Sequence, residues 1–248
     1  MSGNSIGSRG KPIENPLVGH EFHFFGDSFR ILESSRDTND GSLRGDYFAP
    51  PRAKVPEHVH CDQEERFEVI SGTLCIRMGG REMTLNPGQN AVGPPGVPHK
   101  WWNPGKEEEV RFVVELRPAL NTEEFFETAW GLARDGKATG LGIPKNPLQL
   151  AVLANAHQGE AYFIGFPWPP IPVQKALFGV LSLLAPLARL LGYKECYPEY
   201  SGSEPPLGIE GERPSEASEA MVVGIVVAGV IALLALVALL RRARRSSG

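Results

Sequence analysis

The sequence predicts a mainly β fold: a small β-barrel, then a helical extension and one C-terminal transmembrane helix. Three observations support this order. Short runs of alternating apolar and polar side chains, separated by glycine and proline, fill residues 21–117. The apolar spacing becomes helical in residues 118–200, and residues 220–240 carry no charged side chain. A chain of 248 residues with 42% hydrophobic content can bury one good core.

We divide the chain into six parts on this basis. They are a flexible N-terminus (1–20), the barrel (21–117), the helical extension (118–200), a disordered acidic linker (201–219), the transmembrane helix (220–240) and a basic tail (241–248). The formal net charge is only −4, and no basic cluster lies within the barrel. Nucleic acid is therefore not an expected partner.

Two histidines of the barrel region, His58 and His60, lie two positions apart. Side chains two apart in a strand point to the same face, so both imidazoles are aimed at one point. Glu65 belongs to the next predicted strand, where it shares a face with Phe67 and Val69. This motif therefore presents two imidazoles and one carboxylate from neighbouring strands.

A third histidine, His99, follows a predicted tight corner over residues 88–98. Proline removes backbone donors and glycine allows positive φ, so the prolines and glycines of this segment favour a sharp turn into a strand. Three imidazoles and one carboxylate suit a borderline divalent ion such as Zn, Fe, Mn, Ni or Cu. The predicted metal ligands are therefore His58, His60, Glu65 and His99.

Both segments closely resemble the two sequence motifs of the cupin superfamily. The second motif agrees at every fixed position, namely Gly88, Pro94, Gly96, His99 and Asn103. The first has Arg52 in place of the family's leading glycine and agrees at the other positions, His58, His60, Glu65 and Gly72. The resemblance implies a double-stranded β-helix, or jelly-roll barrel, with the four ligands pointing into its interior.

Three functions are open for such a barrel. A metal with open coordination positions supports an enzyme, either a dioxygenase-like oxidoreductase or an isomerase, and Glu65 is then a candidate for proton exchange with the substrate. The alternative is a non-catalytic module that binds or senses a small ligand at a membrane. A third function is dimerisation, since exposed edge strands of the barrel favour a homodimer.

The side chains expected near the metal are apolar. Trp101 lies two residues beyond His99 and faces the same way, while other apolar residues share the inward faces of their strands, namely Phe67, Leu74, Ile76 and Met78. Such walls suit a small apolar or aromatic ligand. For all of them except Trp101, ordinary barrel core is the favoured interpretation.

Capping signals predict two helices in the extension. Asn121 followed three places on by Glu124 is typical of a capping box, and Asn146 followed by Pro147 is typical of a second helix start. Gly136 is a plausible end of the first helix. Residues 173–191 are apolar nearly all round and contain Pro186, which predicts a buried or kinked helix packed on the barrel. A helix resting on a membrane surface is the alternative.

The C-terminal segment 220–240 would form an apolar helix of roughly 31 Å, which matches the hydrocarbon core of a bilayer. Four arginines follow within residues 241–245. The positive-inside rule would place these arginines in the cytoplasm and the barrel outside, yet the first ten residues contain no apolar export segment. We therefore expect a single-pass C-terminal anchor, the lipid bilayer as a partner, and a barrel on the cytoplasmic side.

Overall fold

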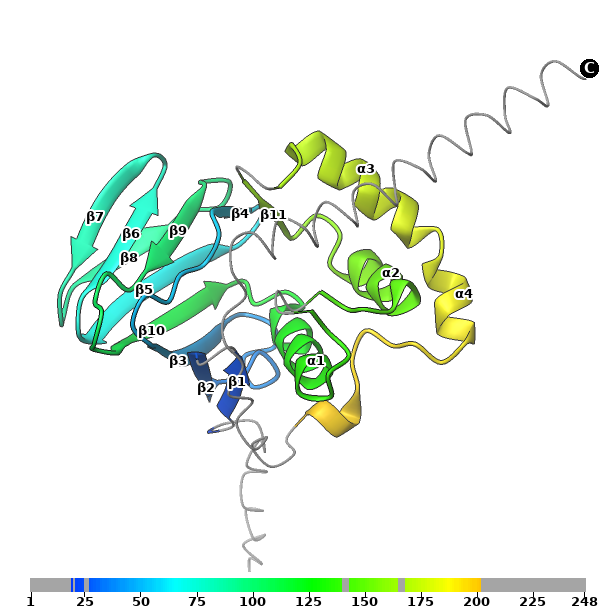
Figure 1. Ribbon diagram of the computed structural model, residues 1–248, viewed down its shortest axis with the longest axis horizontal. Helices are drawn as coiled ribbons and strands as arrows, with labels where there is room; N and C mark the ends of the chain where they lie inside the picture. The colour runs from blue at the N-terminus through cyan, green and yellow to red at the C-terminus, as the bar shows by residue number, and fades with distance from the viewer. Residues whose placement is uncertain (1–18, 20, 25–26, 140–142, 165–167, 202–248) are drawn as a thin grey trace, which may run out of the picture.

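Two antiparallel β-sheets lie on one side of the molecule, and helices α1 to α4 lie on the other (Figure 1). This computed structural model describes residues 19, 21–24, 27–139, 143–164 and 168–201. The larger sheet has the strand order β1-β2-β3-β10-β5-β8. Its strands are β1 (Glu21–Phe24), β2 (Asp27–Glu33), β3 (Leu43–Ala49), β10 (Val110–Arg117), β5 (Glu64–Ser71) and β8 (Asn90–Gly93).

The smaller sheet has the order β11-β4-β9-β6-β7. Its strands are β11 (Ala161–Phe163), β4 (His58–His60), β9 (His99–Trp102), β6 (Leu74–Met78) and β7 (Arg81–Leu85). Strand β11 lies in residues 118–200, for which the sequence predicted helices and no strand. It pairs antiparallel with β4 and so lies beside two of the predicted metal ligands.

The core lies between the two sheets. Phe67, Leu74 and Ile76 are at most 1% exposed, which confirms the core interpretation for these residues. Trp101 was expected to line a ligand cavity, but it is buried in the same core. Its ring centroid lies 5.0 Å from that of Tyr47 and 5.2 Å from that of Phe112. The Trp101 side chain therefore packs against two aromatic rings of the larger sheet.

Arg52 stands in the turn before β4, where the motif has a glycine. Arg52 adopts a φ of 64°, the left-handed conformation that glycine favours. Its N–H donates to the carbonyl of Gly105 at 3.1 Å, which fixes the turn against the loop after β9. Arg52 therefore adopts a backbone conformation that a glycine at this position would take without strain.

Helices α1 (Thr122–Arg134) and α2 (Pro147–Ala156) begin where the capping signals predicted them. The Asn146 side chain accepts hydrogen bonds from the backbone N–H groups of Leu148 and Gln149, as an N-cap does. Asn121 makes no side-chain cap hydrogen bond and instead donates to Glu160 at 3.0 Å. Gly136 follows α1 with a φ of 66°, which confirms it as the end of the helix.

The apolar segment 173–191 forms parts of two helices, α3 (Ile171–Ser182) and α4 (Ala185–Leu190), and not one. Pro186 lies in the first turn of α4, where its missing N–H is tolerated. Both helices pack on α2, and α3 also contacts β11. The break between the two helices agrees with the predicted kink, whereas Leu183 and Leu190 are 77% and 85% exposed, so the segment is not buried throughout. The chain then returns to α1 through a short 3-10 helix, η1 (Pro198–Tyr200).

Across the part of the chain that the structure describes, no helix is both long and apolar enough to cross a bilayer. The predicted transmembrane helix over residues 220–240 lies outside the described residues, as do the basic tail and residues 202–219 of the linker.

Candidate metal centre

Strand β4 presents two imidazoles to the interior. His58 and His60 are its first and last residues, and Val59 between them is buried on the opposite face. The side chains of His58 and His60 are 12% and 13% exposed. The alternation predicted for this motif is thus confirmed, and both imidazoles remain close to solvent.

Strands β9 and β5 supply the other two predicted ligands. His99 opens β9 and is the direct cross-strand partner of His58. Glu65 lies on β5 in the opposite sheet, where its partner is Gly93. A Cβ at Gly93 would lie 3.6 Å from Nδ1 of His99 and 3.4 Å from the Glu65 carbonyl oxygen, so this strand position lies directly beside both ligand residues. His99 and Glu65 are both buried.

The structure brings all four predicted ligands together. One donor atom from each of them lies within 4.8 Å of the others. Glu65 Oε2 is 2.6 Å from Nε2 of His99, 3.5 Å from Nε2 of His60 and 3.9 Å from Nε2 of His58. In a tetrahedral zinc site with bonds of about 2.1 Å, ligand atoms lie roughly 3.4 Å apart. The cluster is therefore close to the size that one ion requires.

Backbone carbonyls fix how two of the imidazoles are turned. Nδ1 of His58 lies 2.9 Å from the carbonyl oxygen of Pro56, and Nδ1 of His99 lies 2.9 Å from that of Val97. A carbonyl oxygen only accepts, so each Nδ1 carries a proton and each Nε2 is turned toward the cluster. Metal-binding histidines are commonly held in this way.

The proton distribution differs among the ligands. Burial, which outweighs the attraction of Glu65, lowers the pKa of His58 to about 4. Burial also lowers the pKa of His99, but its hydrogen bond to Glu65 reverses this effect, and the net pKa is raised. Burial would raise the pKa of Glu65, yet hydrogen bonds from His60 and His99 hold it well below its usual range. The hydrogen bond between them therefore favours a protonated His99 beside an ionised Glu65.

The donor set fits a divalent ion. His99 donates through both nitrogens, so its Nε2 proton occupies the position that a metal bond would take. Nδ1 of His60 is buried and has no hydrogen-bond partner among the described residues. An ion would replace one proton and neutralise the Glu65 carboxylate, with His58, His60 and His99 as its nitrogen ligands.

Asn103, the last fixed residue of the second motif, supports the fold and does not join the cluster. Its side-chain amide donates to the carbonyls of Ala49, Pro50 and Glu108 at 2.8–3.0 Å. Its side-chain oxygen accepts from the N–H of Gly105 at 2.8 Å. The buried Asn103 therefore ties the end of β3 to the loop after β9.

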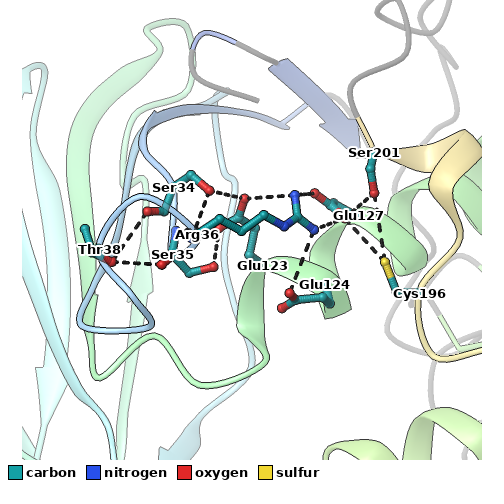
Figure 2. Close-up of polar contacts among 9 residues, drawn as sticks. All are labelled: Ser34, Ser35, Arg36, Thr38, Glu123, Glu124, Glu127, Cys196 and Ser201. Atoms are coloured by element: carbon teal, nitrogen blue, oxygen red, sulfur yellow. Dashed lines mark hydrogen bonds and ion pairs between the residues drawn. The ribbon is translucent and has the colours of Figure 1, made fainter. Parts of the chain in front are cut away.

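A second group of buried carboxylates, not anticipated from the sequence, lies between α1 and the turn after β2 (Figure 2). Glu123 accepts hydrogen bonds from the hydroxyls of Ser34 and Ser35 at 2.7 and 2.5 Å. Arg36 binds both carboxylate oxygens of Glu127 at 2.9 and 3.0 Å. Ser201 donates to the same carboxylate at 2.6 Å. We call this set the α1 carboxylate cluster; it lacks the histidines of a metal site.

Two aromatic residues near the metal centre were not predicted from the sequence. Phe163 on β11 is the cross-strand partner of His58, with ring centroids 6.4 Å apart. Trp168 stacks on Phe163 at 4.1 Å. A three-residue strand inside a helical region gives little periodic signal, so only the tertiary structure reveals this pair.

Comparison with known proteins supports the interpretation of the barrel. Residues 47–115 match the protein family described as "Cupin domain". An oxidoreductase of Arthrobotrys oligospora is 28% identical over 155 residues, which are 60% of this chain and 60% of that protein. The "Probable oxidoreductase yanE" of Aspergillus niger is 31% identical over 157 residues, 60% of this chain and 59% of its own length. The chain thus spans about 60% of the length of these relatives.

Among solved structures, an RmlC-like cupin from Shewanella frigidimarina is similar to this chain. It is 15% identical, with a TM-score of 0.38, and the match covers 48% of this chain and 96% of that one. The family match, the two antiparallel sheets and the four convergent ligand residues agree with the fold implied by the motifs. Residues 47–115 of this chain are therefore a cupin domain.

Proposed function

We propose that this cupin domain binds one divalent ion through His58, His60, Glu65 and His99, and that the protein is a metal-dependent oxidoreductase acting on a small apolar or aromatic substrate. The observation that carries the proposal is the convergence of four donor atoms within 4.8 Å. When bound, the ion supplies Lewis-acid or redox chemistry to a substrate oxygen. The oxidoreductase names of the fungal relatives favour redox chemistry over isomerisation.

In this proposal the protein residues have separate tasks. His58 and His60 hold the ion at the solvent-accessible side, because their side chains retain some exposure. Glu65 and His99 would hold the ion on the buried side, where it replaces the proton between Nε2 of His99 and Oε2 of Glu65, atoms that lie 2.6 Å apart. A carboxylate in this position can accept a proton from a bound phenol or enediol and return it to the product.

Metal analysis of the full-length protein, purified without chelator, tests the proposal. We expect about one divalent ion per chain in the wild type and almost none after His99→Ala, because the substitution removes a buried ligand. His157→Ala is the matched control, since His157 pairs with Glu160 outside the cluster. Absence of metal from the wild type would refute the site.

Oxygen uptake by the metal-replete protein separates the functions. Consumption of O2 with a catechol or enediol, lost in His99→Ala, supports the oxidoreductase. An ion that is bound without turnover, while small ligands still bind, would favour the non-catalytic ligand-binding or sensor module. A zinc-bearing protein that isomerises a substrate without oxygen would favour the isomerase.

We also propose that residues 220–240 anchor this domain to a membrane, with the domain on the cytoplasmic side. The support is the length and uncharged composition of that segment and the arginines that follow it. Full-length protein should sediment with membranes and remain there after a high-salt wash, whereas a chain ending before residue 220 should not. In sealed membranes whose cytoplasmic side faces inward, added protease should leave the barrel intact. Cleavage of the barrel would place it on the outer side of the membrane.

A further inference from the structure

Strand β11 places an aromatic side chain beside the metal centre. Phe163 pairs directly with His58, and Ala161 pairs with His60, so all four side chains project from the same face of the sheet. Tyr162 between them points to the opposite face, where it is buried and stacks with Phe178. The helical extension therefore adds a large ring next to one ligand and a methyl group next to another.

Phe163 is 36% exposed, although the side chains of the four ligand residues beside it are at most 13% exposed. Its ring stacks on Trp168 with centroids 4.1 Å apart and planes 16° apart. The stacked rings present an apolar surface beside the metal centre, since the Phe163 ring centroid lies 6.4 Å from that of His58, with the two planes 56° apart. Such a surface can receive the face or edge of a further planar ring.

A buried glutamine holds this surface in place. The Gln174 side chain accepts from the N–H of Phe163 at 3.1 Å and donates to its carbonyl at 2.6 Å. It also donates to the carbonyl of Pro169 at 2.7 Å. Gln174 is 5% exposed and lies on α3. One side chain thus ties the backbone at Phe163 to the backbone next to Trp168, so the positions of the two rings depend on each other.

We propose that Phe163 and Trp168 form an aromatic binding subsite at the rim of the metal centre, and that this subsite takes the planar ring of a phenolic ligand whose oxygen reaches the ion. This inference rests on the metal site of the proposed function. The small Ala161 leaves the His60 side less crowded than the His58 side. The ring of the ligand therefore lies against Phe163 and Trp168, and its oxygen lies toward the ligand cluster.

Calorimetric titration of full-length, zinc-loaded protein with two probes tests this subsite. Catechol carries a planar ring, and acetohydroxamate binds metals through two oxygens without a ring. Phe163→Leu and Trp168→Leu should each raise the Kd of catechol about 2- to 12-fold, because an aromatic pair contributes roughly 0.5–1.5 kcal/mol. The Kd of acetohydroxamate should change less than about twofold, and the zinc content should remain at the wild-type level.

Two matched variants complete the test. Phe163→Tyr keeps the ring and should retain catechol affinity, whereas Phe178→Leu removes a ring from the opposite face of the strand and should leave both probes unaffected. Unchanged catechol affinity in Phe163→Leu and Trp168→Leu, with zinc retained, would overturn the subsite alone. Failure of the wild type to bind zinc would overturn the proposed metal site and the subsite together.

Discussion

The metal centre and the α1 carboxylate cluster both bury carboxylates, but they satisfy them differently. Glu127 is fully buried and receives two hydrogen bonds from Arg36 and one from Ser201. Glu65 is 8% exposed, and its ion-pair partners among the described residues are the imidazole nitrogens of His58, His60 and His99. Arginine is a permanent cation, whereas an imidazole is charged only when it holds a second proton.

This difference separates a structural cluster from a ligand site. Fixed donors satisfy Glu123 and Glu127 at any ordinary pH, so these residues fasten α1 to the turn after β2. Glu65 depends on a proton at His99 or on a cation that replaces it. Glu65 has no permanently charged partner and is therefore suited to binding a metal ion. Glu127 is already paired with Arg36 and is not.

The largest expected effect is stabilisation of the metal centre by an ion. Zinc at about 1,000 times its Kd should raise the free energy of unfolding by roughly 4 kcal/mol, because only the folded cluster binds it well. Thermal or denaturant unfolding with and without zinc measures this increment. His60→Ala should remove it by deleting one of the convergent nitrogens.

Arg36→Met provides the contrast for the zinc measurement. This substitution alters the α1 carboxylate cluster and not the metal ligands. Zinc should therefore still raise the free energy of unfolding by the same amount, even though the metal-free variant is less stable. A zinc increment that disappears in Arg36→Met but persists in His60→Ala would contradict the division between the two clusters.

The second effect is the loss of stability on breaking the α1 carboxylate cluster. Arg36→Met leaves the buried Glu127 without its bidentate partner. Breaking a fully buried pair costs about 3–5 kcal/mol, and we expect about 2–3 because the Arg36 side chain is 36% exposed and partly screened by solvent. The midpoint of urea unfolding measures the change. Arg66→Met removes an arginine paired with Glu64 on the barrel surface and should cost less than about 1 kcal/mol.

The four metal ligands could be named from the sequence because local alternation and the two motifs mark their positions, while their meeting inside the barrel was implied by the resemblance to the cupin superfamily. The alternation in β4 aims His58 and His60 together, and the turn before β9 delivers His99. The start of α2 at Asn146 was predictable for the same reason, since a cap acts on the next few residues. Each of these features depends on neighbours within about one turn or one strand.

Features that depend on contacts between distant segments could not be predicted. Arg36 and Glu127 are 91 residues apart, and Phe163 meets His58 across 105 positions of the chain. The sequence likewise did not show that Trp101 would pack against Tyr47 and Phe112. Partners of this kind are set by the packing of sheets and helices, which leaves no fixed spacing in the sequence.

The third effect is a dependence of the zinc affinity of the metal centre on pH. His99 has a raised pKa, so below that pKa a proton competes with the ion, and zinc affinity should fall at most about tenfold per pH unit. His58, with a pKa of about 4, does not compete above about pH 5. Zinc titrations at a series of pH values above about 5 measure how steeply the zinc affinity changes with pH.

Metal-free protein should show the opposite slope. The raised pKa of His99 contributes stability that is fully present below its ordinary value of 6.5 and is lost as the pH rises through the folded pKa. His99→Gln should remove this slope. A metal-free protein whose free energy of unfolding rises with pH in that window would contradict the pairing of His99 with Glu65.

The smallest expected effect is the loss of stability when the hydrogen bond from Ser201 to Glu127 is removed and the pair with Arg36 is kept. Ser201→Ala removes one donor at 2.6 Å from Glu127 but leaves both bonds from Arg36, so the carboxylate remains paired. A hydrogen bond to a charged group contributes roughly 1.5–3 kcal/mol when buried, and we expect about 1 kcal/mol here because Ser201 is only half-buried. Urea unfolding measures the loss, and Cys196→Ala is the control, since its Sγ lies 3.8 Å from the same oxygen. Equal losses in the two variants would mean that packing of the segment after α4, and not the hydroxyl of Ser201, holds this end of the chain to α1.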